Sequence, residues 1–227
     1  MSSIGGIRKS LGYIISLGKS RNVNKPNKSA KTKNEADRVK QMVKSMISQP
    51  IESKYFDQSL SSGAVVAGNI YNISDITQGT QVTQRVGQQV TLKSLDLRAA
   101  FNINANVNQA NIRFIVFLDK QGYNSAAVTD VLQAGLVGTS YSDICPYEWN
   151  YRKRFKILHD EVVPLAKGGA NAYSFRHLKL GLNITSQHIG ASTTFTNQIY
   201  LIFIGSETNV LNISSYQYHC RIEFTDE

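Results

Sequence analysis

The last part of the chain alternates apolar and polar residues with the two-residue period of a β-strand. Residues 216–224 show this most clearly, because Tyr, Cys, Ile and Phe alternate there with Gln, His, Arg and Glu. Successive side chains of a strand point to opposite faces of its sheet. One face of this segment is therefore predicted to be buried and the other hydrated.

A longer segment, residues 90–103, alternates in two phases. Val90 and Leu92 set the first phase, and the second runs from Leu95 to Ile103. The change of phase near Lys93 and Ser94 predicts a bulge or a corner within one long strand.

Five further segments have the composition of strands and lie between stretches rich in Gly, Asn and Ser. They are residues 65–73, 112–118, 155–163, 178–184 and 198–204. Within this part of the chain only residues 128–134 have a helical pattern. About eight strands without βα alternation predict an all-β antiparallel sandwich of two sheets, of which the jelly roll is the eight-stranded member. Composition alone does not separate the jelly roll from other sandwiches.

Residues 34–49 are predicted to form a helix, with Asn34 as its N-cap and Pro50 directly after its end. Its apolar residues form one stripe, made of Val39, Met42, Val43, Met46 and Ile47. Its cations occupy the remaining surface and are Arg38, Lys40 and Lys44. Such a helix could pack on its own body or on sister helices and bind a polyanion with its other side. The alternative is a helix that packs on the core and leaves its lysines solvated.

The residues before this helix have little capacity to fold. A weak amphipathic pattern over residues 4–15 is interrupted by glycines, so a disordered terminus is the simpler interpretation. Residues 20–33 contain Val23 as their only large apolar side chain and five cations, so they are predicted to be a disordered basic tether. We therefore divide the chain into a basic arm (1–33), a basic amphipathic helix (34–50) and a β-sandwich domain (51–227).

The charge of the chain is concentrated before the sandwich. The 227 residues carry 25 Lys and Arg against 16 Asp and Glu, a formal net charge of +9. Up to Lys54 there are 12 cations against 3 acids, and the remaining residues balance at 13 against 13. Cations placed on phosphates release condensed counterions, so nucleic acid is the expected partner. The candidate contacts of the arm and helix are Arg8, Lys9, Lys19, Arg21, Lys25, Lys28, Lys31, Lys33, Arg38, Lys40 and Lys44.

A second candidate contact lies within the sandwich, where aromatic residues alternate with cations. The aromatic residues are Tyr147, Trp149, Tyr151 and Phe155. The cations are Arg152, Lys153, Arg154 and Lys156. Rings that stack on bases beside cations that meet phosphates are typical of single-strand binding. The alternative is structural, with Phe155 beginning a core strand and Trp149 filling a contact between subunits.

Several function classes find little support in the sequence. His159, Asp160 and Glu161 form the one cluster that could suggest an enzyme, but neighbours on a strand point to opposite faces and do not converge on one substrate. No nucleotide-binding or hydrolase motif accompanies them. We therefore expect a protein that is not an enzyme. Two cysteines, Cys145 and Cys220, are too few for a disulfide framework and suggest a reducing environment.

Metal and membrane binding are likewise weakly indicated. Calcium between subunits is an open alternative for the carboxylates of Asp160, Glu161, Asp226 and Glu227, although surface acids without an ion are more common. We expect no other cofactor. No apolar run approaches the length of about 18 to 20 residues that spans a bilayer, so no membrane insertion is expected.

The ordered motifs of the chain resemble a known family. RVKQMVKSMI, ESKYFDQS, TQRVGQQVTLKSLDLR, IRFIVFLDKQ, VTDVL and RFKILHDEVV follow one another as in single jelly-roll capsid proteins. The chain is similar to the coat proteins of satellite tobacco necrosis virus and of small circular Rep-encoding single-stranded DNA viruses. The most specific signal is an ordered combination, in which Gln84-Arg85-Val86-Gly87 leads into a long strand and is followed by RFIVF at 113–117 and RFKIL at 154–158. Each motif alone is weak. The turn Asp119-Lys120-Gln121 is closer to the DNA-virus group.

This resemblance implies a jelly roll of which sixty copies close into a small icosahedral (T=1) shell, with the arm facing inward on a single-stranded genome, DNA more than RNA. The protein would then be found in the virion, after assembly in the host nucleus or cytoplasm. Outer loops carry no general chemical signature, so no receptor site follows from them. The rival hypothesis is a nucleic-acid-binding β-sandwich module that carries the same arm and forms no shell.

Overall fold

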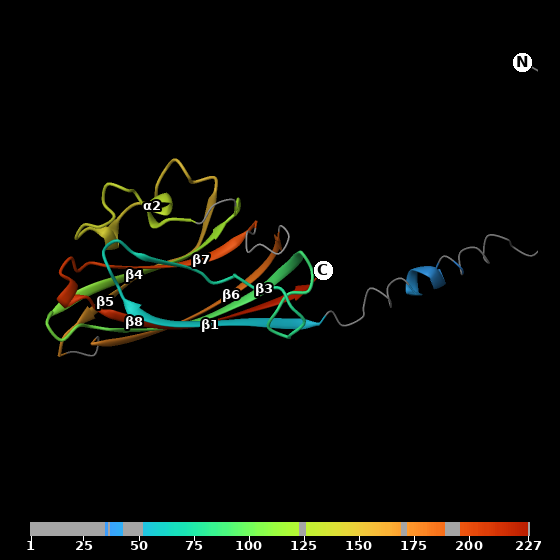
Figure 1. Ribbon diagram of the computed structural model, residues 1–227, viewed down its shortest axis with the longest axis horizontal. Coiled ribbons are helices and arrows are strands. Elements are labelled where there is room, and N and C mark those ends of the chain that lie inside the picture. Colours follow the sequence, from blue (N-terminus) through green and yellow to red (C-terminus); the bar gives the residue numbers. More distant parts are fainter. Residues whose placement is uncertain are drawn as a thin grey trace, which may run out of the picture. The chain divides into compact units, whose positions relative to one another are not determined.

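A computed structural model describes residues 35, 37–42, 52–122, 126–168, 172–188 and 196–226 of the chain. The chain divides into two compact units, Met1–Gln49 and Pro50–Glu227. The second unit is a sandwich of two four-stranded sheets (Figure 1).

Every strand pair in the two sheets is antiparallel. The first sheet has the order β1(Ser53–Gly63), β8(Ser215–Asp226), β3(Gln89–Asn102) and β6(Tyr173–Gln187). The second has the order β2(Asn69–Asn72), β7(Gln198–Gly205), β4(Gln109–Asp119) and β5(Phe155–Ala166). The described part of the sandwich unit also contains three short helical turns, namely α2(Val128–Val131), η1(Ser142–Ile144) and η2(Val210–Asn212).

The pairing of the strands is nested. β1 pairs with β8, β2 with β7, β3 with β6 and β4 with β5, so the chain behaves as one long hairpin rolled into a sandwich. This is the topology of an eight-stranded jelly roll, and the predicted fold class is confirmed.

The seven strand segments named from the sequence all contain a strand, although their bounds differ. The segment 65–73 shortens to the four residues of β2, and the helix expected at 128–134 shortens to α2. β1 was not recognised as a separate strand. It is an edge strand with the sequence SKYFDQSLSSG, whose polar residues weaken the alternation that identifies a strand.

The predicted irregularity in β3 is a β-bulge. Its registers with β6 and with β8 both shift between Leu92 and Ser94. Lys93 is exposed at the shift, and the residues on either side change the phase of their burial there. The two hydrophobic phases of the sequence therefore belong to a single strand that keeps its apolar side on the core.

The core between the sheets is built around one group of aromatic rings. Phe203 of β7 lies 3.9 Å from Tyr216 of β8 between ring centroids, in a stacked arrangement. Phe101 of β3 and Phe114 of β4 lie 5.7 Å apart, and Phe101 lies 6.0 Å from Phe203. Each of these side chains is at most 1% exposed. These contacts join both sheets through their central strands.

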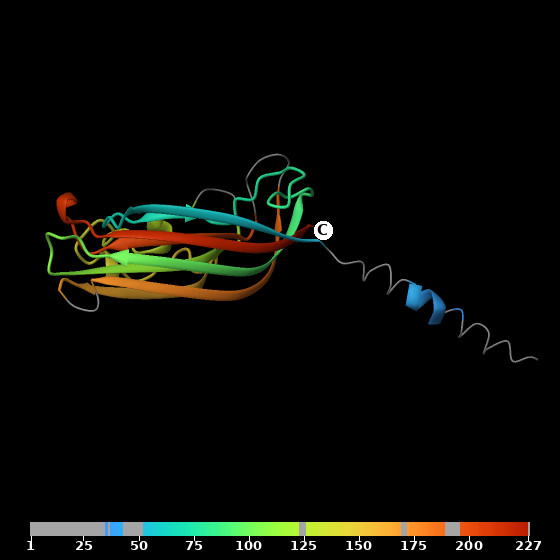
Figure 2. The same cartoon turned by 90° about the horizontal axis from the view of Figure 1, so that it is seen from below.

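A second, smaller core lies on the outer side of the second sheet. There Phe117 of β4 stacks on Tyr200 of β7 with centroids 5.4 Å apart, and the ring of Phe155 contacts Phe117 at 5.3 Å. The connection between β4 and β5, which includes α2, covers this side (Figure 1). The outer side of the first sheet carries no described element, as the turned view shows (Figure 2).

The start of the sandwich is held by a partly buried ion pair. Lys54, one residue inside β1, is 5% exposed and its Nζ lies 2.7 Å from the Asp226 carboxylate at the end of β8. The same carboxylate accepts the backbone N–H of Val86 at 3.1 Å. The chain therefore enters the sandwich beside its own last strand.

The other unit is described over a short stretch. Residues 35 and 37–42 are helical and exposed, as expected for the segment 34–49. Val39 and Met42 of the proposed apolar stripe are 58% and 59% exposed. The expected N-cap Asn34, the rest of the stripe, Lys44, and the arm cations from Arg8 to Lys33 lie outside the described residues. Among the described residues no helix is long and apolar enough to cross a membrane.

Replacing Phe203 by Ala should destabilise the subunit by about 3 to 5 kcal/mol, because it removes the ring shared by both sheets and leaves a cavity. Urea unfolding of the unassembled subunit would measure this loss. Thr208→Ala, in an exposed loop, is the matched control and should change the unfolding free energy by less than about 0.5 kcal/mol. Equal stability of the two variants would mean that this aromatic group does not hold the sheets together.

Candidate nucleic-acid interface

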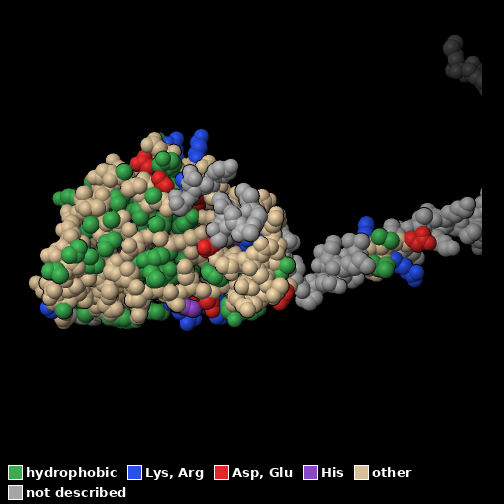
Figure 3. Space-filling model, in the orientation of Figure 1, with side chains coloured by type: hydrophobic (Ala, Val, Ile, Leu, Met, Phe, Trp, Pro, Cys, Tyr) green, Lys and Arg blue, Asp and Glu red, His purple; other side chains and the backbone are tan. Residues whose placement is uncertain are grey.

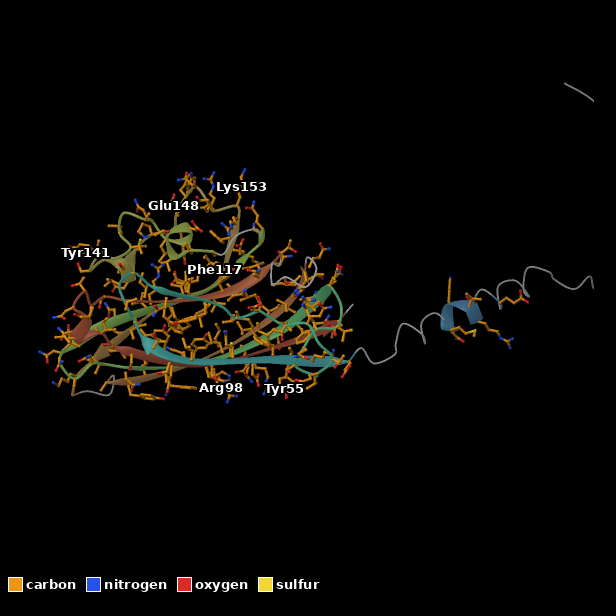
Figure 4. All side chains as sticks on the ribbon, viewed as in Figure 1. Tyr55, Arg98, Phe117, Tyr141, Glu148 and Lys153 are labelled. Carbon is orange, nitrogen blue, oxygen red and sulfur yellow. The ribbon has the colours of Figure 1, made fainter. Side chains whose placement is uncertain are left out.

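The aromatic and cationic residues expected to bind nucleic acid lie in the connection between β4 and β5 and, for Phe155 and Lys156, at the start of β5. Backbone hydrogen bonds hold this connection against α2, since Glu148 N–H donates to the Val131 carbonyl at 2.8 Å and Gln133 N–H to the Pro146 carbonyl at 2.9 Å. Lys153 and Glu148 lie on the opposite side of the sandwich from Arg98 and Tyr55 (Figure 4). The loop therefore presents its side chains away from the bare face of the first sheet.

Trp149 and Arg152 form the most accessible part of this loop. The indole is 71% exposed, and the Arg152 guanidinium lies over it at 3.7 Å from the ring centroid. Arg152 Nη1 also donates to the Trp149 carbonyl at 3.3 Å. Cation–π stacking of this kind holds a ring and a positive charge together in solvent, as single-strand binding requires.

Arg154 has a different environment from the other cations. Its side chain is 13% exposed and its Nη2 lies 2.7 Å from the carboxylate of Asp119, which is fully buried at the end of β4. The hydrogen bonds from Arg154 to Asp119 raise the pKa of this guanidinium. Arg154 therefore serves first to neutralise a buried carboxylate.

The same carboxylate explains the turn that follows β4. Asp119 accepts the backbone N–H of Gln121 at 3.1 Å, so Asp119-Lys120-Gln121 is a side-chain-capped turn. Asp119 at this position therefore has a role in folding, as the cap of the turn and the partner of Arg154.

Tyr147 is partly withdrawn from the loop surface by a buried network. Its hydroxyl donates to Asp160, which also pairs with Arg113 at 2.6 Å, and Arg113 donates to the Cys145 carbonyl. Burial, together with the hydrogen bond to Asp160, raises the pKa of Tyr147 to about 12. Its ring is still 42% exposed and lines a recess of about 140 Å³ with Tyr151 and Arg152.

Three of the four predicted cations in this region are therefore available to an outside partner. Arg152, Lys153 and Lys156 are exposed, whereas Arg154 is not. Phe155 is a core residue, as the structural alternative held, because it is 9% exposed and packs on Phe117. Side chains of both signs and apolar groups share this side of the molecule (Figure 3).

Comparison with known proteins identifies what this sandwich is. The model of a family described as "Satellite tobacco necrosis virus coat protein" matches residues 24–227, most of the chain. The chain belongs to this coat protein family. The coat protein of Maize white line mosaic Satellite virus is 31% identical over 163 residues, which are 70% of this chain and 73% of that protein. As a coat protein, the chain is a structural component of the virion and assembles with copies of itself. Its role is structural and not enzymatic.

Solved viral structures also resemble the coat protein at low similarity. A chain from Desmodium yellow mottle tymovirus is 13% identical with a TM-score of 0.41, over 78% of this chain and 89% of that one. A chain of infectious bursal disease virus, Gt strain, is 10% identical with a TM-score of 0.28, over 79% of this chain and 34% of that one.

His159, His177 and His219 of the coat protein lie on three different strands, with His177 and His219 on either side of Arg98 in the first sheet. His159 contacts Glu161 at 3.3 Å and packs on the Phe114 ring, on the second sheet. His177 contacts Asp96 at 3.0 Å on the first sheet. Burial, together with the charge of Arg85, lowers the pKa of His188 to about 3. Within the cluster 159–161, His159 and Glu161 contact each other, whereas the adjacent Asp160 binds Arg113 and Tyr147.

The acids considered for calcium are engaged within the chain. Asp160 pairs with Arg113, Glu161 with Arg176 and Asp226 with Lys54. Glu227 lies outside the described residues. Among the residues that the structure describes, no group of three or more His, Cys, Asp and Glu could hold a metal ion.

Acid should weaken the coat protein through Asp160. Burial raises the pKa of this carboxyl, but the hydrogen bonds from Arg113 and Tyr147 outweigh burial and hold it below the ordinary value of 3.8. Because the folded pKa is lower than the unfolded one, ionised Asp160 stabilises the fold above about pH 4, and this contribution is lost as the pH falls further.

We expect Asp160→Asn to destabilise the subunit by about 3 kcal/mol at pH 7, since Arg113 loses its partner. The difference from wild type should shrink between pH 4 and pH 2. Urea unfolding at several pH values measures both effects. Asp57→Asn, which breaks an exposed pair with Arg221, is the control and should cost less than about 1 kcal/mol. A difference that stays constant with pH would assign the loss to packing.

Proposed function

We propose that about sixty copies of this coat protein close into an icosahedral (T=1) shell and package a single-stranded genome through the basic arm. The distribution of charge carries this proposal. The first 54 residues hold 12 cations against 3 acids, while the remainder is balanced at 13 against 13. A neutral wall with a cationic extension suits a container for a polyanion.

The number of charges is consistent with a small genome. Sixty arms of net charge +9 bring about 540 positive charges into one shell. If packaging follows charge matching within a factor of a few, the genome has on the order of 10³ nucleotides.

The Trp149 and Arg152 stack supports an additional contact with the nucleic acid. We include Arg152, Lys153 and Lys156 in this contact, because they are exposed beside exposed rings. Arg154 is left out, since its guanidinium is bound to buried Asp119. Arg38 and Lys40, exposed on the helical segment, remain candidates together with the arm cations.

We propose that the genome is single-stranded, and the proposal does not choose between DNA and RNA. The preference for DNA rests on the Asp119-Lys120-Gln121 turn, whose Asp119 has a role in folding. The sequence matches are to coat proteins of satellite viruses and give no support to DNA. Digestion of the packaged nucleic acid with RNase and DNase distinguishes the two. Assembly in the host nucleus or cytoplasm stays a prediction.

Light scattering during size-exclusion chromatography tests the shell. Sixty chains of 25.2 kDa should give a particle of about 1.5 MDa with strong absorbance at 260 nm. An empty particle of this mass would keep the shell and contradict packaging. A stable monomer or small ring, also after nucleic acid is added, would favour a binding module that forms no shell.

Deleting residues 1–33 should remove most packaged nucleic acid and leave the sandwich folded, because the deletion takes away eight cations and no residue of the described core. The ratio of absorbance at 260 and 280 nm in purified particles measures this. A single change such as Lys28→Gln is the control and should alter packaging little, since the contact is diffuse. Packaging that is independent of arm length would contradict the mechanism.

A further inference from the structure

A groove lies on the outer face of the first sheet, near one end of its strands. The groove has a volume of about 500 Å³ and runs across all four strands. Tyr173 and Phe175 of β6 form its apolar end, each 52% exposed, and Leu60 of β1, 40% exposed, lines it at the opposite edge of the sheet. No described element covers this face (Figure 2). Large apolar side chains exposed on a sheet indicate a surface that a partner covers.

Strand register gives the groove its charge. His219, Arg98 and His177 stand directly opposite one another in one row across β8, β3 and β6. The next row contains Gln217, Ala100 and Phe175. Arg98 and His219 line the groove, and none of its lining residues is a carboxylate. Asp96, two residues before Arg98 on β3, contacts Arg98 Nε at 3.3 Å and His177 at 3.0 Å. Arg98 is still 56% exposed, and its other guanidinium N–H groups can donate to a second carboxylate. The groove therefore favours an apolar segment with a carboxylate beside it.

The loop between β7 and β8 has the complementary properties. Val210 and Leu211 of η2 are 76% and 72% exposed, more than any other large apolar residue of the described sandwich. Glu207 is the one charged residue of segment 206–214, and it forms no ion pair with the described residues. This loop is an apolar tip beside a negative charge.

Hydrogen bonds hold the tip in a fixed conformation. Asn209 accepts the Leu211 N–H at 3.0 Å and caps η2. The side chain of Asn104 donates to the carbonyls of Leu211 and Ile213, both at 3.1 Å, and Asn106 also donates to Leu211. A fixed tip loses little conformational entropy when it binds, so its apolar side chains are presented rather than hidden.

We propose that the β7–β8 loop of one coat protein inserts Val210 and Leu211 into the groove of a second copy, with Glu207 facing Arg98 and His219. Loop and groove are different surfaces of one chain, so the contact is head-to-tail and repeats from copy to copy until a ring closes. An aliphatic anchor that fills an aromatic-lined pocket has the character of an interface hot spot. The inference rests on the proposed shell and names one of its contacts.

The double variant Val210→Ser and Leu211→Ser tests the tip. Both residues are exposed, so the subunit should keep its unfolding midpoint while the assembled fraction falls about tenfold or more. Val82→Ser and Val86→Ser, at exposed apolar residues of another loop, form the matched control and should assemble like wild type. Normal assembly of the tip variant, or equal loss in both pairs, would overturn the inference.

A charge exchange tests the partner surface. Glu207→Lys and Arg98→Glu should each weaken assembly, and the chain that carries both changes should recover it, because the exchanged charges meet again. Failure of the double variant to recover, with each single variant impaired, would overturn the pairing. Loss of packaged nucleic acid without loss of assembly in Phe175→Ala would assign the groove to the genome instead.

Cross-linking tests the contact even where no closed shell forms. Single variants Thr208→Cys and Ser61→Cys, at the rims of tip and groove, are mixed and oxidised with diamide. The mixture should give covalent dimers that neither variant gives alone, and the native Cys145 and Cys220 are buried and should not contribute. Particles of wild-type mass without these dimers would overturn the inference and leave the proposed shell standing. Dimers without particles would keep the contact and contradict the shell.

Discussion

The burial of one aromatic group between two sheets is the constraint on which the rest of the molecule depends. Phe203 and Tyr216 stack across the central strands β7 and β8, with Phe101 and Phe114 beside them. A sandwich must keep the inner faces of both sheets apolar, so chemistry is confined to the outer faces, the loops and the chain outside the sandwich. In the coat protein these three locations carry different properties.

The two outer faces are used in opposite ways. The face of the second sheet is closed by the β4–β5 connection, whose Arg154 neutralises buried Asp119, while Phe155 at the start of β5 packs on Phe117. The face of the first sheet is covered by none of the described elements, and strand register sets its charged and aromatic side chains in rows. A covered face leaves its loop free to present Trp149 and Arg152, whereas an open face offers a broad surface that a second copy can cover.

The candidate site could be predicted only in part. Its residue types were evident from the sequence, because aromatic rings and cations alternate between Tyr147 and Lys156. The sequence did not show which of these cations are available to a partner. Arg152 lies over an exposed ring, whereas Arg154 binds a carboxylate 35 residues earlier in the chain. The groove of the first sheet was missed altogether, because Leu60, Arg98 and Phe175 are far apart in sequence and only strand pairing brings them together.

The sequence by itself determined the positions of most strands, the bulge near Lys93 and the separation of a basic arm from a neutral body. These features are local, since the alternation of a strand and the sum of charges need no knowledge of distant residues. Tertiary structure decided that the polar segment Ser53–Gly63 is a strand, because pairing with β8 holds it in place. It also decided which cations remain free and which surfaces stay bare, because both depend on partners that the chain brings together only when it folds.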